Sequence, residues 1–99
     1  MFQKAFFKDL PRETIKEEMQ KEGFAPTIIS NGPGFIYEPH KHTETKYLVC
    51  LEGTMDVTVK DKMYSFEPGD KLIVPGNTLH KAIVGKNGCI FFWSEKGVE

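Results

Sequence analysis

The sequence of 99 residues lacks an apolar run that could cross a bilayer, since a spanning helix needs about 20 consecutive apolar residues. Its first residues also lack the apolar core and cleavage site of an export signal, so we expect a cytoplasmic protein. Basic and acidic side chains nearly balance, with 13 against 14, and neither sign gathers in a long run. The sequence therefore predicts that neither nucleic acid nor a membrane is a partner.

Cysteine and histidine are both scarce. Cys50 and Cys89 are the only cysteines, and each lies inside an apolar run. We favour small buried side chains over a disulfide or a catalytic thiol for this pair. Histidine occurs at three positions only, His40, His42 and His80, so any histidine chemistry must use these residues.

The first third of the chain has the composition of a short helix. Residues 9–22 are rich in helix-forming residues, with Pro11 near the start and Gly23 just after the end. Ile15 and Met19 lie four residues apart and would share one apolar face. The many charged residues around them are best explained as the solvated face of this helix.

The remainder of the chain consists of short β-rich segments separated by turn residues. We predict a single domain over residues 1–99, with a helical extension over 1–25 and a β-barrel over 26–95. The segments with strand character are 27–30, 35–42, 46–52, 54–60, 63–67, 71–75, 80–84 and 89–94. Such a series without intervening helices is typical of an all-β sandwich or barrel.

Two of the three histidines lie two residues apart within one of these segments. On a strand this spacing places the rings of His40 and His42 on one face, about 6.5–7 Å apart along the chain. Two imidazoles so placed can bind one metal ion through bonds of roughly 2.0–2.1 Å. For an isolated pair, however, two polar side chains facing solvent would be the favoured interpretation.

The surroundings of the histidines resemble the two sequence motifs of the cupin superfamily. Residues 34–53 resemble the first motif, G-x5-H-x-H-x3/4-E-x6-G, and residues 69–84 resemble the second, G-x5-P-x-G-x2-H-x3-N. The matching residues are Gly34, His40, His42 and Gly53 in the first motif and Gly69, Pro75 and His80 in the second. Asn77 replaces a glycine of the second motif, and asparagine is the residue that best follows glycine into a left-handed conformation. Val84 replaces the final asparagine, a change that we interpret as minor.

This resemblance implies a fold, a metal site and an assembly. The fold would be all-β, a cupin double-stranded β-helix or jelly-roll barrel preceded by one short N-terminal helix. The metal would be a divalent transition ion (Fe, Zn, Mn or Ni) with His40, His42 and His80 as its ligands. Small cupins commonly pair through their sheets, and the apolar run 89–93 would need cover. We therefore predict a homodimer.

The chain departs from the family at the fourth metal ligand. Cupins usually have a glutamate four or five residues after the second histidine, where this chain has Lys46 and Tyr47. In the favoured interpretation three histidines hold the metal and leave open positions, as in thiol- and diketone-dioxygenase cupins. In a second, Glu44 supplies the carboxylate from the preceding loop. In a third, which ranks next after the first, metal binding is weak or absent and Lys46 joins the histidines in a pocket for an anionic ligand.

Two functions therefore stay open. The first is a metal-dependent enzyme, of dioxygenase or isomerase type, that acts on a small molecule in the barrel, with Lys46 and Glu44 as candidate acid/base groups. The second is a non-catalytic module that senses or stores a small ligand. The aromatic side chains that could wall a pocket are Tyr37, Tyr47, Phe91 and Trp93, for which core or interface packing is the favoured interpretation.

Overall fold

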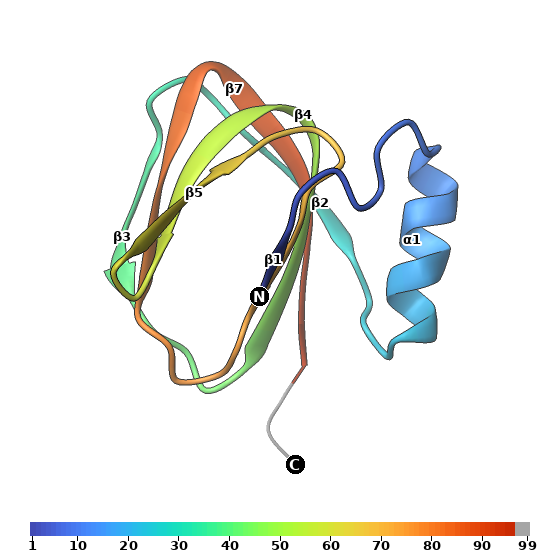
Figure 1. Cartoon of the computed structure of the whole chain (residues 1–99), viewed down its shortest axis with the longest axis horizontal. Coiled ribbons are helices and arrows are strands. Elements are labelled where there is room, and N and C mark those ends of the chain that lie inside the picture. The colour runs from blue at the N-terminus through green and yellow to red at the C-terminus, as the bar shows by residue number, and fades with distance from the viewer. Residues whose placement is uncertain (97–99) are drawn as a thin grey trace.

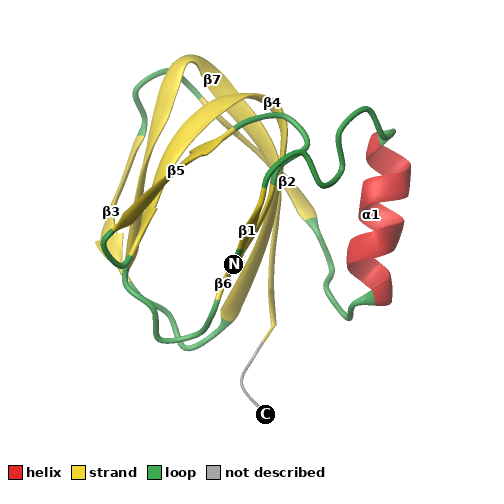
Figure 2. Ribbon diagram, viewed as in Figure 1, coloured by secondary structure: helices red, strands yellow, loops and turns green. Residues whose placement is uncertain are grey.

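The computed structural model describes residues 1–96, and antiparallel strands dominate it (Figures 1 and 2). Its elements are β1 (Phe2–Gln3), α1 (Arg12–Lys21), β2 (Thr27–Asn31), β3 (Ile36–His40), β4 (Thr45–Val59), β5 (Lys62–Phe66), β6 (Lys71–Val74) and β7 (His80–Lys96). The predicted all-β fold with one short N-terminal helix is confirmed. No helix of the described part of the chain is long and apolar enough to cross a membrane.

The long strands β4 and β7 organise the molecule, because each of them takes part in two halves of the sheet. Their ladder begins with Thr45 opposite Lys96 and, past a bend, ends with Val59 opposite His80. In the first half the order is β1-β6-β4-β7-β2, and in the second half β5 pairs with β4 while β3 pairs with β7. The two halves wrap around a common interior, the jelly-roll arrangement that the resemblance implied (Figure 1).

The strands do not stop where the sequence suggested. We expected breaks at 52–53 and 85–88, yet β4 continues through the first and β7 through the second. The predicted strands 46–52 and 54–60 are therefore one strand, and so are 80–84 and 89–94. The ladder shifts register next to Gly53, which has a φ of 76°. A Cβ atom added there would lie 2.0 Å from the carbonyl oxygen of Gly88, so both glycines let the strands bend together without ending. The short strand β1, which pairs with β6, was not predicted.

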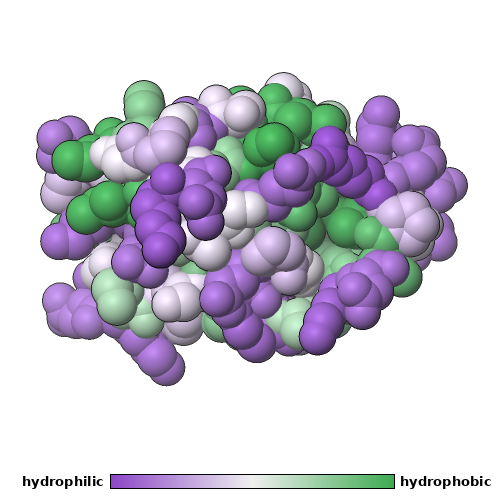
Figure 3. Space-filling model, turned by 90° about the horizontal axis from the view of Figure 1, so that it is seen from above, coloured by the Kyte–Doolittle hydropathy of each residue, from purple (hydrophilic) through white to green (hydrophobic). Residues whose placement is uncertain are grey.

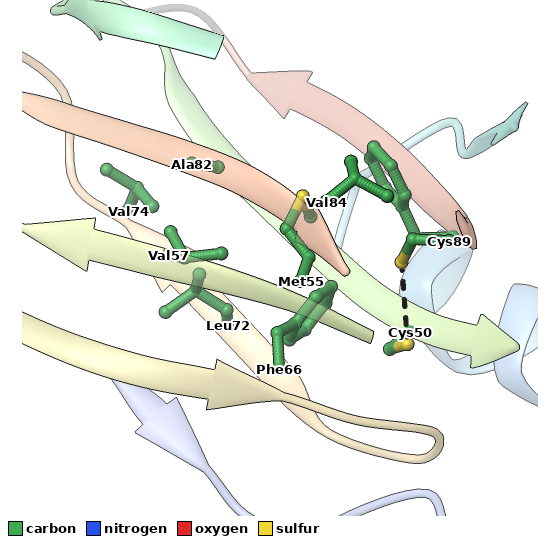
Figure 4. Packing of buried hydrophobic residues seen from close by; sticks show 10 residues of the cluster. Cys50, Met55, Val57, Phe66, Leu72, Val74, Ala82, Val84 and Cys89 are labelled. Atoms are coloured by element: carbon green, nitrogen blue, oxygen red, sulfur yellow. Dashed lines mark hydrogen bonds between the residues drawn. The ribbon is translucent and has the colours of Figure 1, made fainter. Parts of the chain in front are cut away.

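The interior between the two halves is apolar (Figure 4). Its buried residues include Met55 and Phe66 together with Cys50 and Cys89. Both cysteines are free, and their Sγ atoms are 3.8 Å apart. The prediction that they are small buried side chains is confirmed.

Helix α1 lies outside the strands and covers the outer surface of the first half (Figure 1). Ile15 and Met19 are its buried residues and pack in one cluster with Tyr47 and Phe92. The end of the molecule that carries the helix presents largely hydrophilic side chains in Figure 3. The apolar run 89–93 is thus covered within the chain, by the interior on one face and by α1 on the other, which removes our original reason for predicting a homodimer.

Candidate metal centre

A cavity of about 640 Å³ lies between the two halves of the sheet. Six apolar residues make up much of its wall: Leu48, Met55, Val57, Val74, Ala82 and Phe91. Six polar residues line it as well: His40, His42, Glu44, Lys46, His80 and Glu95. The apolar residues are mostly buried whereas His42 and Glu95 are exposed, so these two polar residues mark the open end of the cavity.

Strand pairing brings the first two histidines together. His40 is the last residue of β3 and His80 the first of β7, and the two residues are direct partners in the antiparallel ladder. Side chains of paired residues project to the same face. Their ring centroids are accordingly 4.3 Å apart, although 40 positions separate the residues in the chain.

His42 is positioned beside these two histidines by a loop, not by strand pairing. We expected it on the strand with His40, but β3 ends at His40 and His42 lies in the following loop. The backbone N–H of Asn77 donates to the carbonyl oxygen of His42 and so holds this loop against the turn before β7. Asn77 has a φ of 60°, which confirms the predicted left-handed conformation. The ring centroids of His42 and His40 are 4.6 Å apart.

The three rings suit a divalent transition metal. Their candidate ligand nitrogens all lie within 4.8 Å of one another. Nδ1 of His80 lies 2.9 Å from the carbonyl oxygen of Thr78, and Nδ1 of His40 hydrogen-bonds the carbonyl oxygen of Glu38. When Nδ1 donates its proton to a carbonyl, Nε2 keeps its lone pair for a metal. Burial lowers the pKa of His80 and so favours the neutral imidazole that a metal requires.

Lys46 points into this cavity. Its side chain is only 7% exposed, forms an ion pair with Glu95 and places Nζ 4.8 Å from the centre of the Trp93 ring. Glu44 lines the cavity from the loop before β4, where hydrogen bonds from its own backbone N–H and from Thr43 hold its pKa below the usual value. Within residues 1–96 the one group of side chains whose geometry could hold a metal ion consists of the three histidines and does not include Glu44. That these residues bind a metal or catalyse a reaction stays a prediction.

Sequence reasoning missed Glu95 and undervalued three aromatic residues. Tyr37, Phe91 and Trp93 line the cavity, whereas Tyr47 lies on the opposite face of β4 beneath α1. The strand period of two could have indicated Glu95, because alternate residues of β7 share the inward face with Phe91 and Trp93. Its partnership with Lys46 spans 49 positions and depends on the register of β4 and β7.

Residues 28–94 match the family model described as a cupin domain. Dimethylsulfoniopropionate lyase DddW from Ruegeria pomeroyi is 33% identical over 64 residues, which are 65% of this chain and 42% of that relative. The chain thus spans less than half the length of this curated relative.

Solved structures share the fold at lower identity. An RmlC-like cupin from Shewanella frigidimarina superposes with a TM-score of 0.69 at 21% identity, covering 77% of this chain and 68% of the other. A variant of oxalate decarboxylase from Bacillus subtilis gives a TM-score of 0.69 at 23% identity, covering 75% of this chain and 21% of the other. A further structure of that decarboxylase concerns its Mn(II) centres. These likenesses establish a common fold.

Proposed function

Because the chain belongs to the cupin domain family, we propose that it is a metal-dependent enzyme that acts on a small molecule in the cavity. One observation carries this proposal: three histidine rings meet at the polar opening of an otherwise apolar cavity. Three protein ligands leave coordination positions free, which is the arrangement of catalytic metal sites. A module that only senses or stores a ligand would use the same cavity and is the alternative.

A small carboxylate is the substrate class that we propose. Dimethylsulfoniopropionate and oxalate, which appear in the names of two similar proteins, both carry a carboxylate. Lys46 offers the cavity a cation that can bind such a group, and the apolar wall can bury the rest of the molecule. Both names describe bond-cleaving enzymes, which supports lyase-type chemistry over the dioxygenase or isomerase types that the sequence suggested.

The residues around the opening have separate roles in this proposal. His40, His42 and His80 would hold a divalent ion, with Fe, Zn, Mn and Ni as candidates and the Mn(II) centres of the similar decarboxylase as support for Mn. Such an ion supplies Lewis-acid polarisation of a bound oxygen. Lys46 orients the carboxylate, and Glu44, kept ionised by its hydrogen bonds, can accept a proton at a carboxylate oxygen. Trp93 and Phe91 add aromatic surface to the wall of the cavity.

The direct test is to load the protein with Mn²⁺, Zn²⁺, Fe²⁺ or Ni²⁺ and incubate it with small carboxylates, including dimethylsulfoniopropionate and oxalate. Product formation followed by proton NMR, with His80→Ala as the matched control, would support an enzyme. Tight ligand binding without turnover under every metal would favour the sensing or storage alternative. A protein that binds neither metal nor carboxylate would contradict both.

Replacing Lys46 by methionine is expected to weaken carboxylate binding by about tenfold or more without lowering the metal content. The substitution keeps the length and apolar stem of the side chain and removes a charge-assisted hydrogen bond, which contributes about 1.5–3 kcal/mol. Titration of the metal-loaded protein with propionate, beside elemental analysis, measures both quantities. Unchanged propionate affinity would remove Lys46 from the binding site.

Homodimer formation stays a prediction. One apolar surface available to a second copy lies on the outer face of β3 and β7, where the paired residues Ile36 and Ile83 are 55% and 52% exposed. Size-exclusion chromatography with light scattering should give twice the chain mass of 11.3 kDa. A mass of one chain at micromolar concentration would show that the protein is a monomer.

A further inference from the structure

We propose that Glu95 is a positioning residue that acts through Lys46. Its carboxylate neutralises the lysine at the cavity opening and thereby lets the three histidines hold a divalent cation, although the carboxylate ligand usual in the family is missing. This inference rests on the proposed function, because it concerns the same site.

Lys46 and Glu95 are held together in the cavity by the pairing of their strands. Lys46 and Glu95 are direct partners in the ladder of β4 and β7, and both side chains line the cavity. Lys46 is almost fully buried, while Glu95 is 40% exposed. The contact of Nζ with the ring of Trp93 holds the ammonium group against the β7 wall. Two residues of β7, Glu95 and Trp93, thus hold the ammonium group of Lys46 in place.

Charge explains why the pair matters for a metal. A cupin site with three neutral imidazoles and one carboxylate carries a net charge of about +1 once a divalent ion is bound. Here Glu95 cancels Lys46, and the carboxylate of Glu44 at the same opening brings the occupied site to that same net charge. Without Glu95, the buried ammonium of Lys46 would repel the incoming ion.

The ion pair of Lys46 and Glu95, which favours metal binding, has the opposite effect on the binding of an anionic ligand. A substrate carboxylate that approaches Lys46 must share the ammonium with Glu95, so Glu95 weakens the binding of anions. Removal of the Glu95 charge should therefore move the two affinities in opposite directions. A residue that merely supported the fold would lower both.

The experiment compares Glu95→Gln, Lys46→Met and the double variant K46M/E95Q with the unmodified chain. Zn²⁺ affinity is measured by calorimetry, propionate affinity of the Zn²⁺-loaded protein by NMR titration, and folding by circular dichroism. Glu67→Gln is the matched control, since Glu67 forms an ion pair with Lys4 outside the cavity. We expect E95Q to bind Zn²⁺ about tenfold more weakly and propionate several-fold more tightly, the order of effect of one charge in a partly solvated site.

The double variant separates positioning from folding. Because both charges are absent, K46M/E95Q should recover the Zn²⁺ affinity of the unmodified chain, whereas a structural defect of E95Q would persist in it. Should E95Q not fold, the comparison of K46M with K46M/E95Q still measures the contribution of the Glu95 charge, expected at about tenfold. If E95Q bound Zn²⁺ as tightly as the unmodified chain, and K46M/E95Q as tightly as K46M, the role of Glu95 would be overturned and the proposed function would stand. Absence of Zn²⁺ binding by the unmodified chain would overturn both.

Discussion

Replacing His80 by alanine is expected to lower the affinity for a divalent transition metal by about 100- to 1000-fold. The estimate follows from the apparent binding energy of about 10–16 kcal/mol that structural zinc sites share among four ligands. His80 is central because it is the ladder partner of His40 and its Nδ1 is already directed to the carbonyl oxygen of Thr78. The two histidines that remain would hold an ion only weakly in competition with water.

Calorimetric titration with Zn²⁺ and Mn²⁺, together with elemental analysis after purification, measures this loss. Lys81→Ala is the matched control, because Lys81 is the next residue of β7 and its side chain is exposed. It should keep the full metal affinity. His80 is only half-buried, so the alanine variant should stay folded, which circular dichroism can check. Full metal content in folded His80→Ala protein would contradict the proposed centre.

Replacing Gly53 by alanine should lower the free energy of unfolding by about 2–5 kcal/mol. Left-handed backbone costs an alanine roughly 1–2 kcal/mol, and overpacking a tight site typically costs a further 1–3 kcal/mol. Both terms apply, because Gly53 has a φ of 76° and its new Cβ atom would meet the carbonyl oxygen of Gly88 at 2.0 Å. The opposing atom is backbone in β7, so the bend shared by the two long strands would have to open.

Gly34→Ala is the control that isolates the close approach. Gly34 also has a φ of 76°, but a Cβ atom added there would meet nothing within 4 Å. The free energy of unfolding of Gly34→Ala should therefore fall only by the cost of left-handed backbone, about 1–2 kcal/mol. Urea unfolding of the two variants and the unmodified chain compares them directly. Equal losses in both variants would show that the contact between β4 and β7 relaxes without cost.

The sequence alone determined that one short helix precedes a series of β segments, and it indicated which residues of that helix are buried. The periodicity of Ile15 and Met19 indicated a helix with one apolar face, and the structure buries both residues between α1 and the sheet. The motif resemblance correctly placed all three histidines in one cluster and Asn77 in a left-handed turn. These features depend on neighbours in the chain or on a pattern of fixed spacing, so they can be recognised without knowledge of the fold.

Turn residues, by contrast, gave the wrong boundaries for the long strands. Gly53 and Gly88 were interpreted as breaks, but each bends a continuous strand, since the partner strand supplies hydrogen bonds on both sides of the bend. A glycine only permits the bend. Whether a strand ends there depends on the pairing available beyond it.

The chemistry of the opening was also decided by tertiary structure. His42 lies in the loop after β3, and the hydrogen bond from Asn77 holds this loop so that the ring contacts the other two histidines. Glu95 is the partner of Lys46 across the β4–β7 ladder. Local sequence fixes the face on which a strand residue lies, because the period of two is a property of the backbone. Which residue stands opposite it follows from the register between strands far apart in the chain, and that register is set by the packing of the whole interior.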